Sequence, residues 1–160
     1  MIEGGIKVME SKKGFTLVEL LAVIAILAIL MLLIMPNVLN MFQNGRKDAF
    51  ITQVQTVWRT ANTQYISGSL SGAANSTFAS TCPTGLSSCG QLDVGSTNVK
   101  YFVNINGEGN VAQIGVSDGN FCYVANTNPK LNITREEVGE PNNKTLTCTA
   151  SGSTVTCSCN

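Results

Sequence analysis

The sequence predicts an α+β protein in which one long N-terminal helix packs against a small antiparallel sheet. Three observations support this fold class: a dense apolar block near the N-terminus, an amphipathic segment with helical period after it, and short alternating segments between turn residues in the C-terminal part. The hydrophobic content of 44% is enough for a folded core. Because the formal net charge is zero, we expect no nucleic-acid site.

The apolar block has the length of a membrane span. Residues Phe15 to Met35 are apolar except for Thr16 and Glu19, and at a rise of 1.5 Å per residue they span roughly 30 Å. Lys12 and Lys13 precede the block, and positive charge stays on the cytoplasmic side of a membrane. We therefore expect residues 15–36 to cross the cytoplasmic membrane with the C-terminal part outside.

Two ordinary explanations of such a block fit poorly. A cleaved secretory signal has a shorter apolar core followed by small residues, whereas Met35-Pro36-Asn37 follows here. A plain membrane anchor does not explain Glu19, because a carboxylate inside a membrane span is costly and such residues usually have a function.

The start of the block carries a specific motif. The stretch Lys12-Lys13-Gly14-Phe15-Thr16-Leu17-Val18-Glu19, with the apolar run after it, closely resembles the class III signal of type IV prepilins and pseudopilins. The resemblance extends to the amphipathic segment and leaves the C-terminal two-thirds of the chain without a counterpart. It implies the pilin fold, a long helix on a small antiparallel sheet.

The resemblance also implies roles for single residues. A leader peptidase would cut between Gly14 and Phe15, so that residues 1–14 form the leader and Phe15 becomes an N-methylated N-terminus. Glu19 would be the family's glutamate at the fifth mature position, and Pro36 its helix-bending proline. Met9 offers a second start that gives a compact basic leader, and we hypothesise that residues 1–8 are a start-site artefact.

Glu19 has a physical rationale in this interpretation. In the bilayer its charge lacks a partner, whereas in a bundle of staggered helices the N-terminal amine of a neighbouring Phe15 could neutralise it. A glutamate that merely sits near the lipid headgroups is the simpler alternative. For Pro36 the simpler alternative is a helix stop, but the helical pattern resumes beyond it.

The function that the resemblance implies is structural. The chain would be a type IV pilus subunit whose partners are copies of itself, other pilins, the prepilin peptidase and the cytoplasmic membrane before assembly. It would act in a surface filament for adhesion, motility or DNA uptake, with no cofactor and no catalysis. A pseudopilin of a secretion or competence system is one alternative, and a monomeric membrane-anchored extracellular binding module is another.

Residues 37–67 are predicted to continue the helix with one buried stripe. The apolar positions recur at helical spacing, and we place the polar residues, Lys47 among them, on the opposite face. Gly45 is a plausible flexible point, and Gly68 a plausible helix end. The apolar stripe comprises Phe50, Val54, Val57, Trp58, Ala61 and Tyr65.

The remaining residues divide into a loop, 68–98, and a sheet domain, 99–160. Ser, Ala, Thr and Gly dominate the loop, which a local disulfide between Cys82 and Cys89 would pin. Beyond it, strands are predicted at 99–105, 111–116 and 121–124 as an antiparallel meander, because Asn-Gly and Asp-Gly turns separate them.

The C-terminal end is predicted to be a hairpin. Residues 145–159 alternate around a two-residue turn at Gly152-Ser153, for which we expect type II′ geometry. This register places Cys148 opposite Cys157 at a non-hydrogen-bonded pair, within disulfide range. Cys122 and Cys159 then remain as the third pair by elimination.

No catalytic or metal site is visible in the sequence. The chain has no histidine, which removes Ser-His-Asp and Cys-His catalysis. Glu136, Glu137 and Glu140 lack the ligand spacing of a calcium loop, so we expect them on a solvated face.

Overall fold

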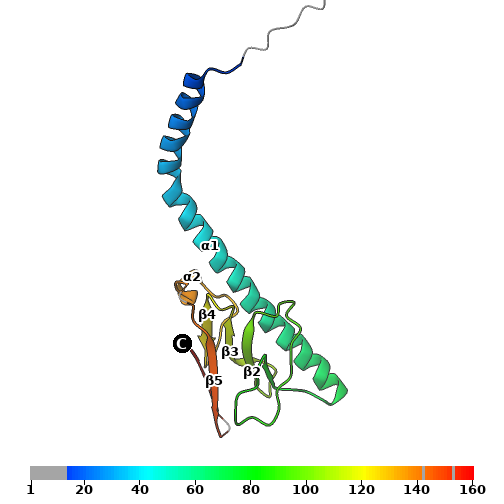
Figure 1. Cartoon of the computed structure of the whole chain (residues 1–160). Helices are drawn as coiled ribbons and strands as arrows, with labels where there is room; N and C mark the ends of the chain where they lie inside the picture. The colour runs from blue at the N-terminus through cyan, green and yellow to red at the C-terminus, as the bar shows by residue number, and fades with distance from the viewer. Residues whose placement is uncertain (1–13, 142, 153) are drawn as a thin grey trace, which may run out of the picture. The chain divides into compact units, whose positions relative to one another are not determined.

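The computed structural model describes residues 14–141, 143–152 and 154–160, and its elements confirm the α+β fold class (Figure 1). One long helix precedes an antiparallel four-stranded sheet and a separate two-stranded sheet. The elements are α1 (Leu17–Ser71), β1 (Thr77–Ala79), β2 (Lys100–Ile105), β3 (Val111–Ser117), β4 (Cys122–Ala125), α2 (Arg135–Val138), β5 (Leu146–Ser151) and β6 (Thr154–Cys159).

The chain forms two units, Met1–Met41 and Phe42–Asn160, and α1 contributes to both. The helix runs on through Pro36, so this proline is not a helix stop. It also runs past Gly68 and ends at Ser71, four residues beyond the predicted end. The reason is that Gly72 supplies the left-handed backbone of the helix cap, with φ of +75°, and the Ala73 N–H donates to the Gly68 carbonyl at 2.9 Å.

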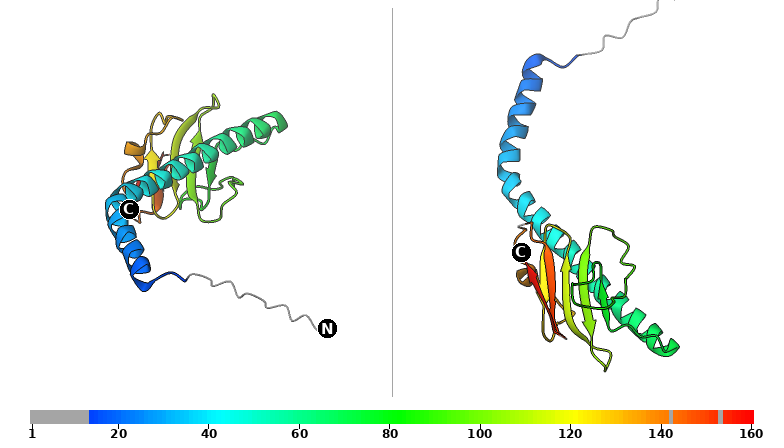
Figure 2. Two further views of the ribbon diagram at one scale, coloured as in Figure 1. Left: turned by 90° about the horizontal axis from the view of Figure 1, so that it is seen from above. Right: turned by 60° about the horizontal axis from the view of Figure 1, so that its bottom comes forward.

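In the second unit, α1 buries the predicted stripe. Phe50, Val54, Val57 and Ala61 are fully buried, while Trp58 and Tyr65 are half-buried at its edge. They pack against one face of the four-stranded sheet, along which residues 42–71 of α1 lie in both views of Figure 2. The sheet contributes Tyr101, Val103, Ile105, Val111, Ile114, Val116 and Tyr123 to this core, joined by Phe121 from the turn before β4.

The placement of Lys47 on the polar face is wrong. Lys47 is only 9% exposed, because it lies one helical turn before Phe50 and therefore on the buried side. Its aliphatic stem is covered while its Nζ donates to Glu140 Oε1 at 2.6 Å. The Glu140 side chain itself is largely exposed, as expected from the sequence.

The four-stranded sheet has the order β1-β2-β3-β4, all antiparallel. β2, β3 and β4 match the predicted meander within one residue at each end. A register shift near Asn104 and Ile105 interrupts the β2–β3 ladder, where Ala112 is the extra residue on β3. The sequence did not reveal β1, whose three residues lie inside the segment predicted as loop.

The hairpin of β5 and β6 forms a sheet of its own on the other face. Its register pairs Ser151 with Thr154 and Cys148 with Cys157, so two residues form the turn. Ser153 lies outside the described residues, and the predicted turn type stays a prediction. The N–H groups of Thr145 and Asn160 each donate to the other's carbonyl, which makes every second pair hydrogen-bonded and Cys148–Cys157 a non-hydrogen-bonded pair.

Hydrogen bonds from two amide side chains, and the packing of Leu146 on Gly115, join the hairpin to the four-stranded sheet. Gln113 donates to the Val155 carbonyl at 3.1 Å. Asn126 pairs with the backbone of Cys157, donating to its carbonyl at 3.0 Å and accepting from its N–H at 3.1 Å. Gly115 leaves room for Leu146, since a Cβ at Gly115 would lie 2.8 Å from Leu146 Cδ1.

The short helix α2 lies in a segment for which no element was predicted. Its first turn is held by Glu137, whose Oε2 accepts from the Thr134 N–H at 2.7 Å. Arg135 makes two hydrogen bonds of 2.6 Å to the Asp48 carboxylate on α1. Within the described ranges, no group of three or more metal-ligating side chains could hold an ion.

The six cysteines form three disulfides in the structure: Cys82–Cys89, Cys122–Cys159 and Cys148–Cys157. These are the pairs expected from the sequence. The Cα atoms of Cys148 and Cys157 are 4.1 Å apart, in agreement with a directly opposed pair.

Candidate functional site

The residues with predicted processing and assembly roles lie at the N-terminal end of α1. Gly14 and Phe15 precede the helix, and the Phe15 side chain is 90% exposed. Glu19 lies in the first turn, one turn from Phe15. Pro36 follows 17 residues after Glu19, about 26 Å further along the helix. Residues 1–13, and with them Lys12, Lys13 and the Met9 hypothesis, lie outside the described residues.

Glu19 and Thr16 form a reciprocal cap on the first turn. Glu19 Oε2 accepts from the Thr16 N–H and from the Thr16 hydroxyl, both at 2.9 Å. The Glu19 N–H in turn donates to Thr16 Oγ1 at 3.3 Å. This capping box satisfies donors that a helix N-terminus otherwise leaves unpaired. The role of Thr16 was missed, although Thr-x-x-Glu before an apolar run is its usual signature.

Beyond the cap, the first unit presents apolar side chains in every direction. All the large aliphatic side chains from Leu17 to Met35 are exposed, between 47% and 78%. A soluble surface with an apolar area of this extent is rare. This part of α1 is long and apolar enough to cross a membrane, and none of its most apolar stretch is buried within the protein.

This arrangement matches a known family motif. Residues 9–35 match the model described as the prokaryotic N-terminal methylation motif. The chain carries a class III prepilin signal. The signal supports a type IV pilin or pseudopilin, and it points to a structural protein processed by a prepilin peptidase and assembled with other pilins. Neither a curated protein nor a solved structure matches the chain.

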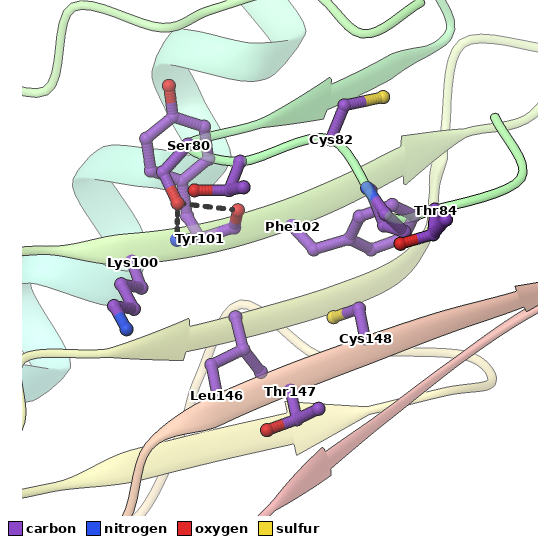
Figure 3. A pocket seen from close by; sticks show the side chains of 11 residues that line it. Ser80, Cys82, Thr84, Lys100, Tyr101, Phe102, Leu146, Thr147 and Cys148 are labelled. Carbon is purple, nitrogen blue, oxygen red and sulfur yellow. Dashed lines mark hydrogen bonds between the residues drawn. The ribbon is translucent and has the colours of Figure 1, made fainter. Parts of the chain in front are cut away.

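The prepilin signal ends before the C-terminal domain, which has pockets of its own. Figure 3 shows one between the Cys82–Cys89 loop, β2 and β5, with Phe102, Leu146 and Thr147 in its lining. Its volume of about 270 Å³ is below the usual range of about 300–1,000 Å³ for small-molecule sites. The Tyr101 hydroxyl points away from it and exchanges hydrogen bonds with the Leu92 backbone.

Proposed function

We propose that this protein is a structural subunit of a type IV pilus. The leader is removed between Gly14 and Phe15, Phe15 is N-methylated, and the mature chain waits in the cytoplasmic membrane with its disulfide-bonded domain outside. Subunits then leave the membrane and pack by their apolar helices into an extracellular filament. The observation that carries the proposal is a prepilin signal followed directly by an exposed apolar helix.

In this proposal, Glu19 makes the helix bundle of the filament more favourable for the subunit than the membrane. Moving an apolar helix from lipid into a helix bundle gains little from the hydrophobic effect, because lipid tails are as apolar as leucine. A charge that is paired in the bundle and unpaired in the membrane makes the bundle the more favourable environment for the helix. Both accepted hydrogen bonds from Thr16 reach Oε2, so Oε1 remains available for the amine that cleavage creates on a neighbouring Phe15.

The capping box allows the charge of Glu19 to be tested apart from its structural role. Glutamine also fits the third helical position of a capping box, so Glu19→Gln keeps the cap and removes the charge. Thr16→Ala removes most of the cap and keeps the charge. We expect Glu19→Gln and Glu19→Ala subunits to be cleaved normally and to form few filaments, whereas Thr16→Ala subunits form many.

The measurement uses cells in which the variant is the sole copy. Mass spectrometry of the subunit reports cleavage after Gly14 and methylation of Phe15, and electron microscopy reports surface filaments. Normal filaments built from Glu19→Gln alone would contradict the charge argument. A leader still attached to assembled subunits would contradict the whole proposal.

The same images separate a pilus from the pseudopilus of a secretion system. Surface filaments many subunits long at native expression support the pilus, and a processed subunit without surface filaments supports the pseudopilin. The extracellular domain favours the pilus, because three disulfides between residues 82 and 159 suit a surface exposed to the medium.

A further inference from the structure

A groove in the second unit has the size and lining of a ligand site. It lies between α1, the turn from β2 to β3 and the loop after β4, and its volume is about 830 Å³. This volume falls within the usual range of about 300–1,000 Å³ for small-molecule sites. The prepilin signal, residues 9–35, belongs to the other unit.

Trp58 provides an aromatic surface in this groove. It is half-buried: one part of the side chain packs against the core, and it also lines the groove. A large indole that is left partly open beside polar groups is typical of recognition sites, because it offers an apolar face next to hydrogen-bonding partners. Trp58 is the single tryptophan of the chain.

Asn62 lies one helical turn beyond Trp58 and lines the same groove. Its Oδ1 is buried and has no hydrogen-bond partner among the described residues. A buried acceptor without a partner destabilises the folded protein. The amide of Asn62 therefore has hydrogen-bonding capacity that the described residues leave unused.

The turn after β2 supplies the opposite rim. Asn106 Oδ1 accepts from the N–H groups of Glu108 at 3.1 Å and Asn110 at 2.8 Å, which fixes the turn and leaves the Asn106 amide hydrogens available as donors. On the third side, Asn128 adopts φ of +43°, a left-handed conformation that shapes the loop beside Thr127. Asn126 is already occupied by the hairpin.

The charges in the lining disfavour an anionic ligand. Among the residues that line the groove, Glu108 is the one charged side chain, and neither lysine nor arginine takes part. A phosphate or nucleic acid would meet a carboxylate and no cation. The lining suits a neutral molecule with many hydroxyl groups and one apolar face.

We propose that this groove binds a neutral carbohydrate, with a pyranose ring stacked on Trp58 and its hydroxyls hydrogen-bonded to Asn62 and Asn106. A pyranose has an apolar C–H face that suits an indole and hydroxyls that both donate and accept. Amide side chains match such hydroxyls, because each amide offers two donors and an acceptor. A peptide that binds by strand addition would need an open strand edge, whereas most residues that line the groove come from a helix, a turn and a loop.

The test is the fluorescence of Trp58 in the full-length protein, dispersed in a detergent without a sugar headgroup. Lactose, cellobiose and N,N′-diacetylchitobiose are titrated separately. We expect at least one to change the emission in a saturable manner with a Kd of about 1 mM or below. Because the subunits are dispersed, sugar binding is measured without filament assembly. A negative result would therefore contradict the carbohydrate site and leave the pilus proposal unaffected.

Two variants in the groove and one control variant decide whether the groove is responsible for binding. Asn62→Ala is expected to weaken binding about tenfold or more, while Gln64→Ala, on the exposed face of the same helix, leaves it unchanged. Trp58→Phe keeps an aromatic core residue, and its binding is followed by equilibrium dialysis with the radiolabelled sugar; we expect it to weaken several-fold. No saturable response to any of the three sugars, or an equal affinity of Asn62→Ala and wild type, would overturn the proposal.

Discussion

Single side chains in the domain are packed so closely that one added carbon cannot be accommodated. Gly90 lies against the ring of Phe78, which is 1% exposed, and a Cβ at position 90 would lie 2.7 Å from Phe78 Cδ1. The N–H of Gly90 also donates to the carbonyl of Thr77, the first residue of β1, and this hydrogen bond holds the Gly90 backbone close to the ring.

Gly90→Ala should therefore destabilise the domain by about 1–3 kcal/mol, the usual cost of overpacking. Gly107→Ala is the control, because a Cβ there meets no atom within 4 Å. Urea unfolding of the two variants, followed by Trp58 fluorescence, measures the difference. Equal midpoints for both variants would show that the ring moves aside at no cost.

A second prediction at this scale concerns the ion pair between Asp48 and Arg135. The Arg135 guanidinium, which donates two hydrogen bonds to it, holds the pKa of the Asp48 carboxyl below its ordinary value of 3.8. A carboxyl with a lowered folded-state pKa stabilises the fold above the unfolded-state pKa. This contribution is lost as the pH falls through the lower, folded-state pKa.

Asp48→Asn should consequently be less stable than the wild type near neutral pH, and the gap should close below about pH 4. Both groups are solvent-exposed, so high salt should narrow the gap as well. Unfolding midpoints measured from pH 7 to pH 2.5 provide the check. A gap that stays constant over this range would mean that the ionised carboxylate does not carry the effect.

At the scale of elements, the domain is three layers held together in different ways. Apolar burial joins the second half of α1 to the four-stranded sheet. The hairpin is joined to the opposite face by a smaller apolar cluster and by amide side chains. The Asn126 side chain makes the two hydrogen bonds to Cys157 that the backbone of a neighbouring strand would make, one to its N–H and one to its carbonyl.

Asn126→Ala should loosen the hairpin more than the rest of the fold. The backbone of Cys157, a residue only 2% exposed, would lose both partners, at an expected cost of about 1–3 kcal/mol. Hydrogen exchange should speed up at Cys157 and its β6 neighbours, with little change in β2. Asn120→Ala, at an exposed turn, is the control; the same exchange pattern in both variants would contradict this role.

At the scale of the whole molecule, the disulfides close loops of different length. Cys122–Cys159 spans 37 residues, whereas Cys148–Cys157 spans nine and Cys82–Cys89 seven. In the chain-entropy model the long loop is worth about 4 kcal/mol and each short loop about 2.5 kcal/mol. The long bridge also ties the end of the chain to β4.

Replacing both cysteines of a pair by alanine should therefore lower stability most for Cys122 and Cys159. The pair Cys82 and Cys89 is the matched comparison, because it closes a short loop at the surface. Thermal unfolding of the two double variants ranks them, and peptide mapping of the wild type checks the pairing. Fragments that link Cys157 to any cysteine but Cys148 would show that the hairpin register is wrong.

The sequence by itself determined the features that depend on neighbouring residues. The prepilin signal was identified by its resemblance to a family motif of consecutive residues. The stripe from Phe50 to Tyr65, the meander and the Cys148–Cys157 register follow from local spacing, because helical period, strand alternation and turn length act over a few residues. Even the capping box of Thr16 and Glu19 was present in the sequence, although it was not recognised there.

Tertiary structure alone decided the features that depend on distant partners. β1 is too short to show an alternation and exists because β2 offers it a free edge. Lys47 lies on the buried side of α1, and the partner of its charge is Glu140, which is 93 residues away in sequence. The groove at Trp58 and Asn62 arises where a helix, a turn and a loop converge. A local sequence pattern does not reveal contacts between distant segments, because burial and pairing are properties of the packed chain.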